Sequence, residues 1–250
     1  MTSNKPTAYG KLCSMFYDAT KAYAPAPEVA FYASFIEKNP GRVLEAMSGS
    51  GRLQIPLIQR GYIVDGVDNS AIMLDRCRQR CAELNITPEL YQQSLEHLSI
   101  PHTYATVTIA VGSFQLLVDR AQALQALKNI RAHMQDNGNL LIDIFVPDTD
   151  DDGSEALSTR IADIDLHTKI ILTTRYTFDT QARRADALCT YELVIDDVVQ
   201  EKEQELIQVT WYTDEELQQL LQEAGFTTVA FYDETFRASG PSRIIQAQAV

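Results

Sequence analysis

Short apolar segments alternate with helical segments between residues 42 and 146, and this alternation constrains the fold more than any other feature. It predicts strands over residues 42–45, 62–68, 90–92, 106–112 and 139–146. Between them, apolar residues recur three and four positions apart, which predicts helices over residues 52–60, 70–84 and 122–134. Such a chain folds into a parallel sheet with right-handed crossovers and helices on both faces.

The pattern changes after Pro147 and returns at Thr213. Three segments in between alternate as strands do and predict an antiparallel meander over residues 169–178, 185–195 and 198–211. Thr213 and Glu216 then form the capping box of a further helix, which precedes a hairpin over residues 227–232 and 243–250. The predicted fold class is α/β, with a doubly wound, mostly parallel seven-stranded Rossmann-like sheet and an inserted antiparallel β-meander.

Three parts organise the chain, whose 250 residues suffice for one domain with an inserted lobe. Residues 1–40 are predicted to form an aromatic helical segment, which Pro25 and Pro27 divide. Residues 41–153 and 211–250 are expected to form the α/β domain, and residues 154–210 the insertion.

The charge of the chain limits its partners. Its 34 Asp and Glu residues outnumber 21 Lys and Arg residues, which gives a formal net charge of −13. This charge repels a phosphate backbone and an anionic membrane, so neither nucleic acid nor a membrane is an expected partner. No apolar run approaches the roughly 20 residues that span a bilayer, and the amino-terminal residues do not resemble a signal peptide.

The four cysteines indicate neither a disulfide framework nor a zinc site. Cys77 and Cys81 stand one helical turn apart, with no His or further Cys nearby to complete a set of zinc ligands. We therefore expect a reduced cytoplasmic protein without a bound metal. The sequence leaves open whether it is a monomer or a homodimer.

A glycine-containing loop and an acidic residue mark the predicted ligand site. Gly49 and Gly51 follow the first strand, where they let a ligand approach the backbone closely. Asp68 ends the second strand, and in a doubly wound sheet the carboxyl ends of the strands line the ligand crevice. A carboxylate there can accept hydrogen bonds from both hydroxyls of a ribose. The alternative is that Asp68 only caps the next helix.

These residues lie in a segment with a family resemblance. Residues 43–80, VLEAMSGSGRLQIPLIQRGYIVDGVDNSAIMLDRCRQR, resemble the first two motifs of class I S-adenosylmethionine-dependent methyltransferases. The helix from Thr213 to Gly225 resembles the late helix of that family, and the insertion resembles its small-molecule branch. The resemblance covers nearly the whole chain. It implies an enzyme that transfers a methyl group to a small-molecule acceptor and releases S-adenosylhomocysteine.

The resemblance also implies which residues bind the cofactor. Glu45 would orient the methionine amino group, Asp68 would bind the ribose hydroxyls, and Asn69 and Met73 would flank the adenine. The complete implied set is Glu45, Ala46, Met47, Ser48, Gly49, Gly51, Arg52, Asp68, Asn69, Met73, Ser94, Leu95, Glu96, Gly112, Ser113 and Phe114.

Two of these positions depart from the family pattern, and a third allows two roles. Met47 stands where the family has its first loop glycine, and Ser94 replaces the acidic residue that is common after the third strand. Arg52 can pair with the carboxylate of the cofactor or lie in solvent as an ordinary helix residue. The two acids, Glu45 and Asp68, favour a sulfonium cation over the pyrophosphate of a dinucleotide.

The catalytic residues stay unknown. Methyl transfer is an in-line displacement, for which alignment supplies much of the acceleration, and a base is needed only when the nucleophile holds its proton tightly. The candidate bases are His97, His102, His133 and His167. The aromatic segment and the insertion are expected to border the acceptor. Candidate lining residues are Tyr17, Tyr23, Phe145, Tyr191, Trp211 and Arg237.

Other functions are compatible with parts of this pattern. A nicotinamide-dependent dehydrogenase shares the sheet but needs a Gly-x-Gly-x-x-Gly loop. A nucleic-acid methyltransferase is disfavoured by the charge and by the residues after the fourth strand, Gly112-Ser113-Phe114-Gln115. The main alternative is a non-catalytic protein that uses this fold to hold the cofactor or a partner.

Overall fold

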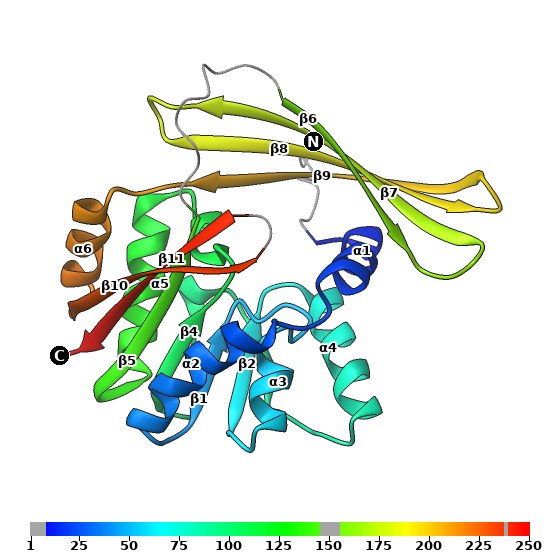
Figure 1. The fold of residues 1–250 in the computed structure, drawn as a ribbon. Helices are drawn as coiled ribbons and strands as arrows, with labels where there is room; N and C mark the ends of the chain where they lie inside the picture. The colour runs from blue at the N-terminus through cyan, green and yellow to red at the C-terminus, as the bar shows by residue number, and fades with distance from the viewer. Residues whose placement is uncertain (1–8, 146–155, 238–239) are drawn as a thin grey trace. The chain divides into compact units, whose positions relative to one another are not determined.

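The computed structural model describes residues 9–145, 156–237 and 240–250, apart from the side chains of residues 228, 229, 237 and 240–242. The chain divides into two compact units (Figure 1). The larger unit comprises Tyr23–Pro147 and Trp211–Val250, and the smaller unit comprises Met1–Ala22 and Asp148–Thr210. The predicted helical segment of residues 1–40 is therefore shared between the two units.

A seven-stranded sheet forms the centre of the larger unit, in the order β10-β11-β5-β4-β1-β2-β3. Strand β11 runs antiparallel to β10 and β5, and the remaining neighbours run parallel. The prediction of a mostly parallel, doubly wound sheet is confirmed. The strands are β1 (Val43–Ala46), β2 (Val64–Asp68), β3 (Leu90–Gln92), β4 (Tyr104–Ile109), β5 (Met134–Ile144), β10 (Phe226–Arg237) and β11 (Gly240–Ala249).

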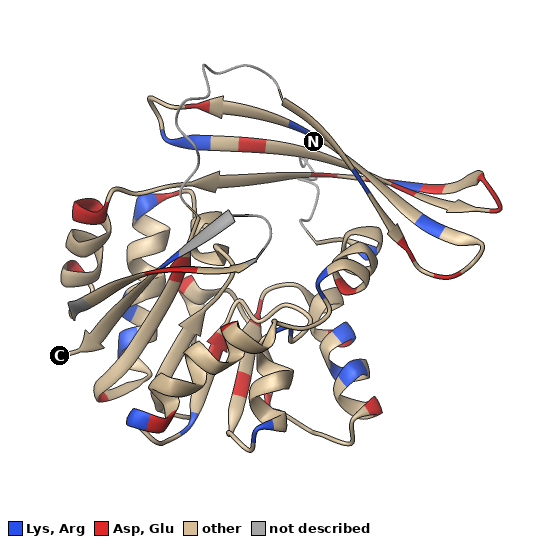
Figure 2. Ribbon diagram, viewed as in Figure 1, with Lys and Arg blue, Asp and Glu red and all other residues tan. Residues whose placement is uncertain are grey.

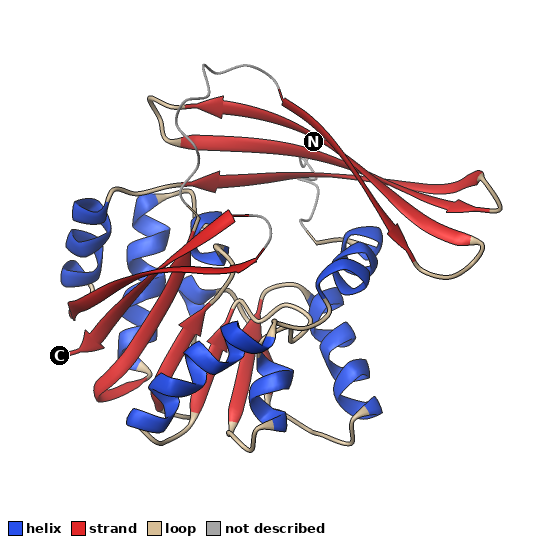
Figure 3. Ribbon diagram, viewed as in Figure 1, coloured by secondary structure: helices blue, strands red, loops and turns tan. Residues whose placement is uncertain are grey.

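Helices cover both faces of this sheet (Figure 3). Alternation along β1 explains the two cores, because Val43 faces one layer of helices while Leu44 and Ala46 face the other. The first layer contains α2 (Ala26–Lys38) and α3 (Gln54–Gln59). The second contains α5 (Arg120–Ala132) and α6 (Asp214–Glu223). Helix α4 (Ala71–Glu83) packs Cys77 and Cys81 against Ile55 of α3, and short 3-10 turns η1 (Leu95–His97) and η2 (Ser113–Leu116) follow β3 and β4.

The smaller unit contains an antiparallel sheet of four strands, one more than the predicted meander. Its strands, in spatial order, are β6 (Ala156–Asp163), β7 (Thr168–Asp179), β8 (Arg184–Ile195) and β9 (Val198–Thr210). Strand β6 escaped prediction because Ala162 is its only buried residue, so no apolar alternation marks it. The other three strands lie close to their predicted bounds.

Helix α1 (Lys11–Lys21) packs its apolar side chains, Leu12 and Phe16 among them, on the sheet of the smaller unit. Its N-cap is Gly10, which has no side chain to accept the first N–H groups of the helix. Glu203 of β9 takes this role: its carboxylate accepts hydrogen bonds from the backbone N–H groups of Leu12 and Cys13, both at 3.1 Å. The helix therefore depends on a strand almost 200 residues away for its cap.

Acidic and basic residues are interspersed in both units, as Figure 2 shows. Within the described residues, no helix combines the length and the apolar character that crossing a bilayer requires.

The predicted capping box at the start of α6 is confirmed. Thr213 Oγ1 accepts a hydrogen bond from the backbone N–H of Glu216 at 3.3 Å, and the Glu216 carboxylate accepts one from the N–H of Thr213 at 2.9 Å. We expect Thr213→Ala to cost about 1 kcal/mol, which lowers the melting temperature by about 2–4 °C. Gln219→Ala, on the exposed face of the same helix, is the control and should leave the melting temperature nearly unchanged. Equal melting temperatures for both variants would contradict the expectation.

Candidate functional site

The loop after β1 is tied to the end of β2. The backbone N–H of Ser48 donates to the carbonyl of Val67 at 3.0 Å, and the N–H of Gly49 donates to Asp68 Oδ2 at 2.8 Å. Strands β1 and β2 are parallel neighbours, so their carboxyl ends lie at the same edge of the sheet. The structure thus brings the predicted glycine loop and the predicted ribose acid together.

Asp68 is held by backbone donors and still faces partly outward. Its Oδ1 accepts a hydrogen bond from the N–H of Ser70 at 2.8 Å, while Oδ2 is bound by Gly49. Burial raises the pKa of Asp68, and the hydrogen bonds from the backbone N–H groups of Ser70, Gly49 and Asn69 oppose that shift. The N-cap of α4 is Ser70, whose side chain accepts from the N–H of Met73 at 3.3 Å. Each carboxylate oxygen of Asp68 retains further lone-pair capacity for ligand hydroxyls.

The glycine loop adopts a left-handed backbone at three positions: Met47 (φ 58°), Gly49 (φ 55°) and Gly51 (φ 82°). At Gly51 a Cβ atom would also stand 2.7 Å from Cys77 Sγ. At Gly49 the nearest atom to such a Cβ is Met73 Cε at 3.9 Å, so the surface of the loop there is open. Met47 thus adopts a left-handed backbone that favours glycine, at a typical cost of about 1–2 kcal/mol for a non-glycine residue.

Two buried polar atoms beside the loop are without a hydrogen-bond partner among the described residues: Glu45 Oε2 and Ser48 Oγ. Glu45 is only 4% exposed, and burial raises the pKa of its carboxyl to about 8. The charge of Arg52 opposes this shift, and that of Glu28 adds to it. A buried acceptor without a donor is costly unless a ligand supplies one. An ammonium group is such a donor, so Glu45 fits the amino-acid tail of S-adenosylmethionine.

Arg52 is a buried ion-pair residue and not the solvated residue that one interpretation allowed. Its Nη1 and Nη2 atoms donate to Glu28 Oε1 and Oε2 at 2.9 and 2.6 Å. The two side chains are 6% and 0% exposed. Two guanidinium donors are thus directed at Glu28 of α2. The sequence alone did not single out Glu28, because no local pattern links it to Arg52.

The remaining predicted cofactor residues follow the ends of β1 to β4. Ala46 is buried at the end of β1, Asn69 is exposed beside Asp68, and Met73 is buried in α4. After β3, Ser94 precedes η1 and its Oγ lies 3.0 Å from His97 Nδ1. The other two residues there are Leu95, which is buried, and Glu96, which is half-buried.

The turn after β4 is shaped by its backbone. Gly112 has a left-handed conformation (φ 70°), and Ser113 Oγ donates to the carbonyl of Ala110 at 2.8 Å. Phe114 is fully buried in the core, with its ring 6.1 Å from that of Tyr212. Phe114 therefore anchors the turn in the core.

The candidate acceptor residues fall in both units. Tyr23, Phe145 and Trp211 belong to the larger unit, and Tyr17 and Tyr191 to the smaller one; the side chain of Arg237 lies outside the described residues. Tyr23 is half exposed and stacks on Arg80, with 4.5 Å from the guanidinium carbon to the ring centre. Arg80 also donates to the carbonyl of Ser50 at 2.8 Å, which places Tyr23 beside the glycine loop.

Tyr191 lies in the interior of the smaller unit, where its hydroxyl donates to Glu205 Oε1 at 3.1 Å. The candidate bases are each bound locally. His97 contacts Ser94, His102 pairs with Glu89, His133 contacts the carbonyl of Asn129, and the exposed His167 pairs with Asp196 at 2.9 Å. These contacts support structural roles for the histidines.

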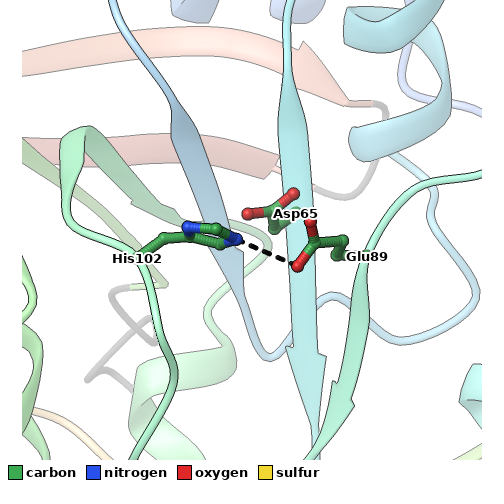
Figure 4. Close-up of side chains that lie close together, drawn as sticks. All are labelled: Asp65, Glu89 and His102. Carbon is green, nitrogen blue, oxygen red and sulfur yellow. Dashed lines mark hydrogen bonds and ion pairs between the residues drawn. The ribbon is translucent and has the colours of Figure 1, made fainter.

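A cluster at the start of the strands was not predicted. The ligand atoms of Asp65, Glu89 and His102 all lie within 4.8 Å of one another (Figure 4). Arg42 already supplies a cation there: its Nε lies 3.1 Å from Asp65 Oδ2 and its Nη2 lies 2.9 Å from Glu89 Oε1. Hydrogen bonds from Tyr91 and Arg42 lower the pKa of Glu89 to about 2. The cluster is an ion-pair network that joins the beginnings of neighbouring strands.

The chain is similar to known methyltransferases. Residues 43–138 match a family model described as a methyltransferase domain. A protein of Geobacillus sp. (strain WCH70) that is named as a methyltransferase is 29% identical over 103 residues, which cover 41% of this chain and 42% of that protein. A Bacillus subtilis (strain 168) protein with a similar name is 24% identical over 128 residues, 51% of this chain and 52% of its own length. The chain thus matches about half of each relative.

Solved structures share the fold over almost the whole chain. An S-adenosylmethionine-dependent methyltransferase from Clostridium acetobutylicum has a TM-score of 0.78 at 14% identity, covering 97% of this chain and 99% of its own. The sugar N-methyltransferase KedS8 from Streptoalloteichus also has a TM-score of 0.78, at 16% identity, covering 98% and 96%. CalS10, an amino pentose methyltransferase from Micromonospora echinaspora solved with S-adenosylmethionine, has a TM-score of 0.73 at 16% identity, covering 99% and 100%.

The fold is that of class I S-adenosylmethionine-dependent methyltransferases, and the glycine loop and Asp68 lie within the part of the chain that matches a methyltransferase domain. The matched residues 43–138 run from β1 into β5 and include both the glycine loop and Asp68. S-adenosylmethionine is the cofactor of this class.

Proposed function

We propose that this protein transfers the methyl group of S-adenosylmethionine to an amine of a small molecule, with amino sugars as the first class to test. The observation that carries the cofactor part is the buried carboxyl of Glu45, one oxygen of which has no partner among the residues that the structure describes; Glu45 lies on the strand next to that of Asp68. A cofactor with a sulfonium cation and an ammonium group in its amino-acid tail complements these two acids. The phosphates of a dinucleotide do not.

The chain's own residues bind and orient in this proposal. Asp68 accepts hydrogen bonds from the ribose, Glu45 accepts one from the ammonium group, and the open surface at Gly49 admits the ligand to the backbone. When bound, the cofactor supplies an electrophilic methyl group. Alignment of an acceptor with that group provides acceleration without a dedicated nucleophile on the protein. A protonated amine has no free lone pair, so it must lose one proton before the transfer; no residue of the chain is assigned as the base for that step.

Two observations support a small cationic acceptor. The net charge of −13 attracts a protonated amine and repels nucleic acid. In addition, the structural neighbours CalS10 and KedS8 are named for amino pentose and sugar N-methylation. Candidate acceptor-lining residues of the larger unit in this proposal are Tyr23, Phe145 and Trp211, none of which is buried.

The proposal is tested in two steps with the full chain. Calorimetry should detect binding of S-adenosylmethionine with a dissociation constant in the range of about 1 µM to 1 mM that enzymes show for their substrates, and no binding of NAD. Formation of S-adenosylhomocysteine is then measured with amino sugars, with the matching hydroxyl sugars and with RNA. We expect turnover with amino sugars at least tenfold above the other two.

The outcomes separate the alternatives. Cofactor binding without turnover on any acceptor would favour the non-catalytic protein with the same fold. Turnover on RNA or on hydroxyl sugars alone would overturn the amine assignment, and binding of NAD in place of S-adenosylmethionine would overturn the proposed function altogether.

A further inference from the structure

Hydrogen bonds join helix α2, with the residues that precede it, to Arg52 at the end of the glycine loop. The Arg52 guanidinium forms two hydrogen bonds to the Glu28 carboxylate in α2. The backbone N–H of Ala24 donates to the carbonyl of Arg52 at 2.9 Å, which ties the residues before α2 to the same loop. These bonds connect α2 to the glycine loop through buried atoms.

The pair lies on the face of the sheet to which Glu45 points. Alternation along β1 puts Glu45 on the same side as Val43, which packs with α2 and α3. The groups that act on Glu45 are Arg52 before α3, Glu28 of α2, Asp68 of β2 and the thiol of Cys77 in α4. Its neighbour on β4 is the uncharged Thr108. Arg52 is the only cation within this set.

A buried arginine next to two carboxyl groups can neutralise either of them. Its two Nη donors are bound to Glu28, at distances typical of charge-assisted hydrogen bonds. Glu45 receives a hydrogen bond from the backbone N–H of Gln54, and its Oε2 has no partner among the described residues. The arrangement leaves an acceptor available beside the loop where a cationic ligand would enter.

We propose that Glu28 and Arg52 are positioning residues: Glu28 holds both Nη donors of Arg52, so that these donors do not bind Glu45, and Glu45 Oε2 stays available for the ammonium group of the cofactor. This inference rests on the proposed function of the site. It assigns Arg52 an indirect role, in contrast to the direct contact with the cofactor carboxylate that the sequence allowed.

Cofactor binding is expected to change the protonation state of Glu45. Burial raises the pKa of Glu45 to about 8, so at pH 7 its carboxyl is mostly protonated before binding. An ammonium group beside it favours the carboxylate, so its pKa falls in the complex. Binding at pH 7 should therefore release close to one proton per cofactor. Calorimetry in two buffers with different heats of ionisation measures this number.

Glu28→Gln is the main variant, and Glu37→Gln on the exposed face of the same helix is its control. Without Glu28, the two Nη donors of Arg52 lose their acceptors and can turn toward Glu45, which favours the carboxylate form of Glu45 before the cofactor binds. We expect S-adenosylmethionine to bind about tenfold more weakly, with well below half a proton released. Glu37→Gln should match the wild type in both quantities. If Glu28 only stabilises the local structure, Glu28→Gln should weaken cofactor binding but still release close to one proton.

The double variant Glu28→Met with Arg52→Met tests the same role with both charged partners removed. Exchange of a buried ion pair for apolar residues of similar size is often tolerated, and it removes the cation that competes for Glu45. We expect binding within about threefold of the wild type and a proton count near one. If Glu28→Gln does not fold, the affinity and the proton count of the double variant test the inference by themselves.

Two results would overturn the inference while the proposed function stands: Glu28→Gln binding like Glu37→Gln, or a double variant at least tenfold weaker than the wild type. A wild-type chain that does not bind the cofactor would instead refute the proposed function, and this inference with it.

Discussion

Asp68→Ala is expected to weaken S-adenosylmethionine binding by a factor on the order of 100 or more. The carboxylate is proposed to accept two hydrogen bonds from the ribose, and a hydrogen bond to a charged group contributes about 1.5–3 kcal/mol. The same side chain accepts the backbone N–H groups of Gly49 and Ser70, so its removal also loosens the loop after β1. Calorimetry on the folded variant measures the effect.

Two variants separate binding from loop structure. Asp68→Asn keeps one oxygen acceptor for the backbone and should lose less stability than Asp68→Ala, while still binding the cofactor weakly. Asp75→Ala removes an exposed carboxylate from α4 and should bind like the wild type. If Asp68→Ala folds, as judged by circular dichroism, and binds with wild-type affinity, then the assignment of Asp68 to the ribose is wrong.

Gly51→Ala is expected to destabilise the protein by about 2–5 kcal/mol. The left-handed backbone at this position costs an alanine about 1–2 kcal/mol, and overpacking of a buried site typically adds about 1–3 kcal/mol. The overpacking follows from the 2.7 Å between the new Cβ and Cys77 Sγ. For a chain of this size, we expect the melting temperature to fall by about 5–15 °C.

Gly61→Ala is the matched control, since Gly61 has a similar backbone (φ 92°) but no atom within 4 Å of the position that a Cβ would occupy. It should show the backbone cost alone. Gly51→Ala combined with Cys77→Ala should recover part of the difference between the two, because the sulfur is removed. Equal melting temperatures for Gly51→Ala and Gly61→Ala would show that contact with Cys77 does not constrain the loop.

The sheet and the end of β2 were predictable because both are marked locally. Strands buried on two faces read as continuous apolar runs, as in 106–112, and Asp68 interrupts such a run where a strand meets a helix. The seven strands and the capping box at Thr213 followed from the same kind of signal. Strand β6 did not, because a strand with one buried residue has no alternation to detect.

The partners of the site residues could not be predicted. Glu28 and Arg52 are 24 positions apart, and their pairing depends on how α2 folds over β1. The network of Arg42, Asp65 and Glu89 likewise joins residues from three separate parts of the chain. Sequence patterns report which face a residue occupies, whereas pairing across elements requires the packed structure. This is why the predicted roles of Arg52 included solvent exposure.

The cap that Glu203 provides for α1 bears on how the protein is made. The first helix of the chain emerges from the ribosome long before residue 203 has been added, and Gly10 cannot substitute for the missing acceptor. An isolated helix of 11 residues is marginal in water. During translation this segment therefore lacks its cap until the last strand of the smaller sheet is synthesised, so we expect the helix to become stable only then.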